Sequence, residues 1–359
     1  MQEKIHRYQL AIIIYMIQVG ISIFTLPRIV AEAFGTNGWI ALLFVSFIGV
    51  LNILLIGLVF HFGKDRTIFQ LLEKSIPKLL LFPIYIAIAL LWSCLAVLIA
   101  KDFELILRLL YYPTMPTSVF VIMALILTYW LVRSGIVHIA RTTVIFMATI
   151  VIALILLFPL AEFRLTRLTS FIFEGETSLF TGGLQVYFSF LGYELSLLLI
   201  PYLTKKKSAY KPVLFGHLLI TFIYLITCFI AFGFFSFPQL LNDTFPLLTM
   251  FEYIELPFLE RIEGMIFHLF IFEVLVTIIL YFWGADQFFK QAIPKLSSRF
   301  SILILLIIAF ILTLFIKITR EVEKWIMIIG SGGIIVAFGL PIFILLLMGI
   351  SNIVHRLRT

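Results

Sequence analysis

Long apolar segments separated by short polar ones dominate the sequence. A bilayer core needs about 20 apolar residues per helix, and about ten runs meet that length. The predicted spans are residues 10–33, 39–62, 82–103, 116–132, 143–161, 184–203, 213–236, 265–285, 301–317 and 325–350. The pattern predicts an all-α membrane protein with about ten transmembrane helices, since helices satisfy their own backbone groups in lipid.

Two polar segments are longer than turns. Residues 63–81 place apolar side chains at helical spacing among charges, which predicts a helix lying in the inner membrane interface. Residues 237–264 are rich in Pro and acidic residues, and we expect short helices that cap the outer face. Docking of a partner is the alternative interpretation of this second segment.

Composition and charge agree with this class of protein. Hydrophobic residues make up 62% of the chain and charged residues 13%, against about a quarter in soluble domains. Mean hydropathy is +1.16. The net charge of +7 lies in the loops, so it favours a topology role over nucleic-acid binding. With the N-terminus inside, most of the 26 Lys and Arg, including the run at 205–207, fall in inner segments, which predicts that both termini are inside.

The sequence offers little chemistry for catalysis. Cys94 and Cys228 lie in apolar runs, with no other Cys or His at metal-ligand spacing. The stretch GSGG at 330–333 lacks the Lys and Ser or Thr of a phosphate loop, so it predicts close helix packing or a bend. We therefore predict no enzyme activity, no cofactor and no metal.

Two of the predicted spans are disturbed near their middle. The first contains GISIFTLPR at 20–28, where Gly20 is a poor helix former and Ser22 and Thr25 can bond freed backbone groups. The sixth contains Gly192 and the ionisable Glu194, which is costly in lipid unless it is paired or hydrated. Each Gly alone could serve helix packing, but the paired positions favour two broken helices.

The two disturbed spans stand five apart in the chain. This spacing predicts a five-plus-five inverted repeat, with repeat one at about 10–161 and repeat two at about 184–350. Paired broken helices mark a midplane binding site in such folds, because each break exposes amides at one helix end and carbonyls at the other. A small amino acid matches both kinds of group. We expect its carboxylate at the amides of Gly20, Ile21 and Ser22, and its ammonium at backbone groups of Leu191, Gly192 and Tyr193.

Further polar residues in the spans are candidates for the cavity. Glu194 is expected to polarise or hydrate it, and Ser93 and Val97 to form a wall. Glu273 and Thr277 stand four apart, and so on one helix face. We expect the Thr277 hydroxyl to bond a ligand, to line a polar cavity or to bond the backbone of its own helix. We expect the Glu273 carboxyl group to form an ion pair, to be protonated or to contact water.

Charges near the outer helix ends have a simpler interpretation. Arg28 is expected to neutralise an outer acidic residue, and the charges at 101–108 to form local ion pairs. Arg261 and Glu263, at the start of span eight, are expected to anchor that helix or to contact a partner.

Three stretches, GISIFTLPRIVAEAFGTNGWI at 20–40, FSFLGYELSLLLIPYL at 188–203 and LERIEGMIF at 259–267, resemble the B subunits of spore germinant receptors. The resemblance covers essentially the whole chain and implies the LeuT/APC-like fold of the amino acid–polyamine–organocation transporter superfamily. It also implies a nutrient sensor in the spore inner membrane that acts with A and C subunits, in contact with membrane lipid, to trigger germination. Tyr193 departs from it, since a smaller residue is expected before the Glu.

Two other functions remain open from the sequence. One is a self-sufficient, proton-coupled amino acid transporter that uses Glu194 or Glu273. The other is a water or ion conduit.

Overall fold

The computed structural model describes the backbone of the chain apart from residues 1–3, 65, 156–162, 169–170, 176–177, 206–207, 255–261 and 359. It describes the side chains of the same residues, apart from 148–155, 262 and 351–358. The predicted inner charges Lys206 and Lys207 and the predicted anchor Arg261 therefore lie outside the described residues.

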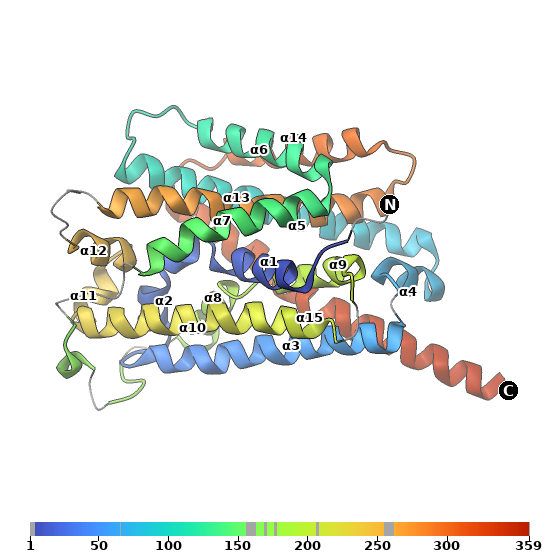
Figure 1. Cartoon of the computed structure of the whole chain (residues 1–359), viewed down its shortest axis with the longest axis horizontal. Coiled ribbons are helices and arrows are strands. Elements are labelled where there is room, and N and C mark those ends of the chain that lie inside the picture. Colours follow the sequence, from blue (N-terminus) through green and yellow to red (C-terminus); the bar gives the residue numbers. More distant parts are fainter. Residues whose placement is uncertain are drawn as a thin grey trace.

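Helices form nearly all of the described chain (Figure 1). The elements are α1 (Arg7–Val19), η1 (Ile21–Phe24), α2 (Leu26–Phe34), η2 (Gly38–Ile40), α3 (Ala41–Gly63), α4 (Ile68–Ser75), α5 (Lys78–Leu110), α6 (Val119–Ser134), α7 (Ile136–Ile155), η3 (Leu165–Arg167), α8 (Leu179–Phe188), η4 (Tyr193–Leu195), α9 (Ser196–Leu199), η5 (Ile200–Tyr202), α10 (Tyr210–Phe234), α11 (Phe237–Asn242), α12 (Pro246–Glu252), α13 (Ile262–Ala292), α14 (Ser298–Leu314) and α15 (Thr319–Arg358). Both chain ends lie at the right-hand end of the bundle in Figure 1, called here the terminal end.

A helix or a broken helix occupies each of the ten predicted spans. Within the described residues, five segments are long and apolar enough to cross a membrane by themselves. They correspond to α3 together with η2, and to α5, α10, α13 and α15. The bent pair of α8 and residues 193–202 would make a sixth. Shorter apolar helices supply α1, α6, α14 and the described part of α7. The chain is therefore a multi-pass membrane protein, as the sequence predicted.

Both predicted breaks are present. The first span divides at Gly20, whose φ of 41° and ψ of −173° end α1, and it resumes through η1 into α2. The sixth span divides at Gly192, where φ is 119° and the two halves meet at 52°. Positive φ is easily reached only by Gly, so these residues set where the helices stop.

The two broken spans lie inside a shell of continuous helices. Helix α1 is almost wholly buried and packs against α7, α10 and α13, while α13 makes its largest contact with α5 (Figure 1). Each break is thus surrounded by intact helices whose side chains can reach the backbone groups that the break frees.

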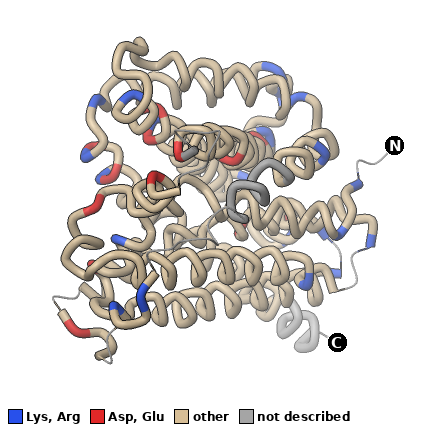
Figure 2. Tube along the Cα trace, turned by 60° about the vertical axis from the view of Figure 1, so that its left-hand side comes forward, with Lys and Arg blue, Asp and Glu red and all other residues tan. Residues whose placement is uncertain are grey.

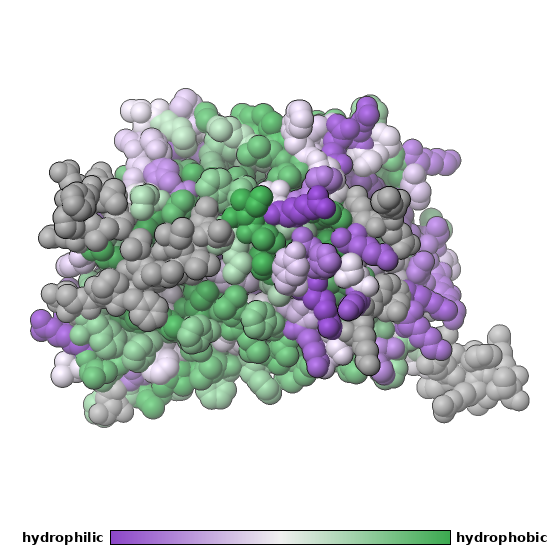
Figure 3. Space-filling model, in the orientation of Figure 1, coloured by the Kyte–Doolittle hydropathy of each residue, from purple (hydrophilic) through white to green (hydrophobic). Residues whose placement is uncertain are grey.

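Polar segments cover the two ends of the bundle. At the terminal end, α4 begins with Thr67 and Gln70 in a capping box, which confirms the predicted helix in 63–81. Short helices α11 and α12 lie in the predicted outer segment. Lys and Arg lie largely at helix ends and in loops (Figure 2), and hydrophilic side chains gather at the terminal end of the face in Figure 3, beside a broad hydrophobic band.

A polar link joins the sixth span to α15. Pro341 lies inside α15 and has no N–H, so the carbonyl of Ala337 loses its normal partner in the helix. Asn52 of α3 replaces that partner, because its Nδ2 donates to the Ala337 oxygen at 2.9 Å. The same Nδ2 donates to the Tyr193 hydroxyl at 2.7 Å. One buried amide therefore serves both the proline site in α15 and the break in span six.

We predict that Asn52→Ala lowers the free energy of unfolding by about 1–3 kcal/mol, because it leaves buried acceptors without a donor. Thermal unfolding in detergent measures the change. The matched control is Asn242→Ala, since the exposed Asn242 donates only to the nearby Pro238 oxygen. An equal effect of the two substitutions would contradict the role assigned to Asn52.

Candidate functional site

A cavity of about 410 Å³ lies between the broken spans and helices α5, α13 and α15. Its walls are mostly aliphatic and aromatic, and they include Ile17, Ile29, Leu95, Ile99, Ile106, Phe188, Phe245, Ile326 and Met327. Polar groups are few at its depth and include Gln18, Ser22, Thr25, Ser189, Thr277 and Tyr281. An apolar pocket with a few convergent polar groups is the usual form of a small-molecule site.

Five of the predicted site residues line this cavity: Gly20, Ile21, Ser22, Leu191 and Thr277. A Cβ added to Gly20 would meet no atom within 4 Å, so the break in span one faces open space. The structure therefore brings the predicted amide segment at 20–22 to the cavity. Whether these residues bind a ligand stays a prediction.

Glu194 lies beside the cavity and not on its surface. It is 1% exposed. Its Oε2 accepts the Gly192 N–H at 2.6 Å, and its Oε1 accepts the Tyr281 hydroxyl at 2.9 Å. Because Tyr281 lines the cavity, Glu194 holds the break in span six and reaches the cavity through that hydroxyl.

Gly192 and Tyr193 also lie away from the cavity surface. A Cβ on Gly192 would stand 2.0 Å from the Ile17 Cγ2, so only Gly allows the two broken spans to touch here. The Tyr193 hydroxyl bonds to the hydroxyl of Tyr187 and to Asn52. Tyr193, which departs from the expected small residue, thus ties the break to neighbouring helices.

Thr277 lines the cavity and also bonds the backbone of its own helix, whereas its contact with a ligand stays a prediction. Its Oγ1 lies 3.2 Å from the Glu273 carbonyl of its own helix and 3.5 Å from the carbonyls of Met16 and Ile17.

Glu273 is fully buried, and neither carboxylate oxygen has a hydrogen-bond partner among the described residues. Glu273 does not line the cavity. Glu273 is thus a buried ionisable group that has no hydrogen-bond partner in the part of the chain that the structure describes.

The predicted wall from span three is on the wrong face of its helix. Ser93 bonds the Ala89 carbonyl at 2.8 Å, and neither Ser93 nor Val97 lines the cavity. Leu95 and Ile99 line it instead. Apolar residues lie on all sides of this stretch of α5, so the pattern of polar and apolar positions does not indicate which face meets the cavity.

Two polar residues at the breaks were not among the predicted site residues. Gln18 lines the cavity, and its Nε2 donates to the Phe190 carbonyl at the end of α8. Tyr224, on α10, places its hydroxyl beside carbonyls of both broken spans. A Gln in the middle of an apolar run was a visible sign of a special role for residue 18.

Charged residues surround the mouth of the cavity, at the end of the bundle opposite the termini. Arg28 and Glu32 form an ion pair at 2.7 Å, which confirms that an acidic residue neutralises Arg28. Asp102, Arg320, Glu323 and Lys324 line the same mouth. A mouth of mixed charge above an apolar chamber suits a polar molecule that enters from water.

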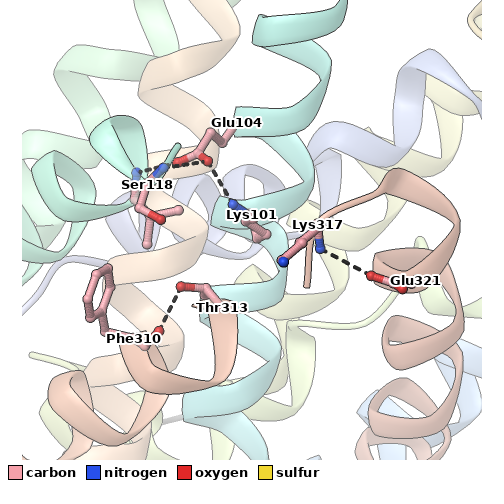
Figure 4. A network of polar contacts seen from close by, with 8 residues as sticks. Lys101, Glu104, Ser118, Phe310, Thr313, Lys317 and Glu321 are labelled. Carbon is pink, nitrogen blue, oxygen red and sulfur yellow. Dashed lines mark hydrogen bonds and ion pairs between the residues drawn. The ribbon is translucent and has the colours of Figure 1, made fainter. Parts of the chain in front are cut away.

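A buried ion pair supports the helix next to this mouth (Figure 4). Lys101 pairs with Glu104 at 2.8 Å, as predicted for local charges in this segment. Glu104 also accepts the backbone N–H groups of Ser118 and Val121 at 2.8 and 3.3 Å. The carboxylate thus fastens α5 to the start of α6.

The terminal end of the site is closed by main-chain contacts. The Ile5 N–H donates to the Tyr202 carbonyl at 2.9 Å, and the Thr204 N–H donates to the Ile5 carbonyl at 3.1 Å. These bonds join the segment before α1 to the segment after η5. The two broken spans are therefore tied together at one end and separated by the cavity toward the other.

The stretch at 330–333 packs closely, as the sequence predicted. Added Cβ atoms at Gly330, Gly332 and Gly333 would lie within 3.3 Å of side-chain atoms of Phe188, Leu91 and Leu191, respectively. Small residues therefore bring α15 against the sixth span and α5.

A family model described as "spore germination protein" matches residues 4–322 of this chain. Spore germination protein GerQB of Bacillus cereus is 26% identical over 331 residues, covering 90% of this chain and 89% of the relative. Spore germination protein YndE of Bacillus subtilis (strain 168) is 26% identical over 308 residues, covering 84% of this chain and 85% of the relative.

Among solved structures, the chain is similar to a substrate-bound, outward-open Na⁺-coupled sialic acid symporter, with a TM-score of 0.66 and 13% identity. The match covers 94% of this chain and 78% of the symporter. At this identity the likeness concerns the fold alone, and it confirms the predicted LeuT/APC-like architecture. The boundaries of the two repeats stay a prediction.

We predict that Gly192→Ala strongly destabilises the protein, because the methyl group would overlap Ile17 and the residue would need a positive φ. The unfolding temperature in detergent measures this. Gly339→Ala is the control, because a Cβ at Gly339, in α15, meets nothing within 4 Å. Wild-type stability of Gly192→Ala would show that the close approach is not required.

Proposed function

This chain belongs to the spore germination protein family, and we propose that it is the nutrient-sensing B subunit of a germinant receptor. The observation that carries the proposal is the cavity at the two helix breaks, open at the end opposite the termini. Within the described residues no group of three or more His, Cys, Asp or Glu could hold a metal.

The chemistry of the cavity supports a small amino acid as the ligand. The amides of Gly20, Ile21 and Ser22 lie at the start of a helical segment, where a carboxylate is stabilised by free N–H groups and the helix dipole. The aliphatic walls suit a short apolar side chain. Backbone carbonyls at the ends of α1 and α8 supply acceptors for the ammonium group.

Binding would change the balance between conformations of the broken spans. A ligand shifts a protein toward the conformation that it binds more tightly. Here the ligand would contact α2, α8 and α15 together, because residues from all three line the cavity. We propose that the resulting displacement passes to the A and C subunits in the spore inner membrane, with both termini of this chain inside, and triggers germination.

A proton-coupled amino acid transporter is the second candidate. The observation that favours it is Glu273, whose buried carboxylate has no hydrogen-bond partner among the described residues. A carboxyl group in that setting can take up and release a proton as its surroundings change. Glu194 is less suited to this role, because both of its oxygens are occupied.

We predict that Gly20→Leu abolishes binding of the nutrient, because its side chain would fill the cavity at the break and the residue would have to adopt a positive φ. Germination of spores carrying this variant should fail while the protein still inserts in the membrane. Gly339→Leu, at another position with open space around it, should respond normally. Normal nutrient sensitivity of Gly20→Leu would contradict the proposed site.

We predict that the purified protein in liposomes binds amino acids but does not accumulate them under a pH gradient without its partner subunits. Uptake of radiolabelled L-alanine and L-valine measures this. Accumulation that depends on the gradient and disappears in Glu273→Gln would instead establish the transporter.

A further inference from the structure

The carbonyl groups freed by the two breaks meet at one hydroxyl group. The Tyr224 hydroxyl lies 2.5 Å from the Gln18 carbonyl and 3.0 Å from the Val19 carbonyl, both at the end of α1. It lies 3.1 Å from the Ser189 carbonyl, which follows α8. Tyr224 itself belongs to α10, more than 200 residues from Gln18 in sequence, and is fully buried.

One hydroxyl cannot satisfy three carbonyls. A Tyr hydroxyl has a single proton, whereas each carbonyl oxygen has two lone pairs. At any moment most of the acceptor capacity of the three carbonyls is unused, although they are buried and point to one place. Unused acceptors in such a setting favour a group with several donors.

An ammonium group has the missing donors. It carries three N–H groups and a positive charge. The charge is attracted to the carbonyl oxygens at the ends of helices. Gln18 and Ser189, which carry two of the three carbonyls, line the cavity, and so does Ser22. The Ser22 Oγ stands 3.4 Å from the Tyr224 hydroxyl on the same side.

The backbone at 191–193 is less suited to receive this group. The Gly192 carbonyl already accepts the Leu195 N–H at 3.2 Å, and neither Gly192 nor Tyr193 lines the cavity. Gln18 already donates to the Phe190 carbonyl. In the sixth span, the Ser189 carbonyl is therefore the acceptor that remains for the amine. Its hydrogen-bond partner among the described residues is the Tyr224 hydroxyl, which it shares with Gln18 and Val19.

We propose that Tyr224 is the positioning residue for an ammonium group, holding the carbonyls of Gln18, Val19 and Ser189 together so that a ligand amine binds them. This proposal rests on the proposed amino acid site and refines it, since it names these three carbonyls as the acceptors of the ligand's ammonium group, in place of the backbone at 191–193 expected from the sequence. Tyr224 acts through the backbone of both broken spans, so it couples recognition of the amine to their relative position.

The test compares two probes that differ only in the amine: L-valine and 3-methylbutanoate, its analogue without the amino group. Binding to the full-length protein in detergent is measured by calorimetry for wild type, Tyr224→Phe and Tyr15→Phe. Tyr15 is the matched control, because its buried hydroxyl has no hydrogen-bond partner among the described residues. Glycine, L-alanine and L-leucine extend the panel for the wild type.

We expect Tyr224→Phe to weaken L-valine binding roughly tenfold, because the carbonyls that accept the ammonium group would no longer be held together by the hydroxyl. Its affinity for 3-methylbutanoate should not change, and Tyr15→Phe should match the wild type for both probes. An equal loss for both probes, or no loss for either, would overturn the role of Tyr224 but leave the amino acid site standing. A wild-type protein that binds both probes equally would also overturn it. Failure of the wild type to bind any amino acid of the panel would instead overturn the proposed function.

Discussion

The structure depends on one requirement: backbone N–H and C=O groups inside a membrane must find partners within the protein. Two spans here give up helical bonds at Gly20 and Gly192, so the surrounding helices must supply replacements. Tyr224 and Gln18 serve the carbonyls, and Glu194 serves an amide. The polar side chains in the middle of this hydrophobic protein are arranged largely around this requirement.

The two breaks are satisfied in different ways. At Gly192 the backbone touches Ile17, and Glu194 closes the gap by bonding both the Gly192 amide and Tyr281. At Gly20 the backbone borders the cavity, and no atom stands where a Cβ would be. The sixth span therefore provides a fixed surface, whereas the first provides the open backbone that a ligand can contact.

Much of the architecture followed from simple patterns. Apolar run length located the ten spans, and Gly beside Ser, Thr or Glu located both breaks, because few residues other than Gly permit the required backbone angles. The finer geometry could not be predicted. The sequence predicts that Ser93 and Val97 form the cavity wall. This stretch of α5 is apolar on all sides, however, so the pattern does not show which face of the helix meets the cavity. The role of Tyr224 depends on contacts with residues about 200 positions earlier, which only packing decides.

The contact between Ile5 and residues 202–204 has a consequence of its own. Its two hydrogen bonds run from main chain to main chain, so exchanging side chains at these positions leaves the bonding groups in place. Relatives of this chain could therefore differ widely in their side chains here and still keep the two broken spans joined at this end. Separating the two broken spans at this end would require both of these bonds to break, whatever side chains the positions carry.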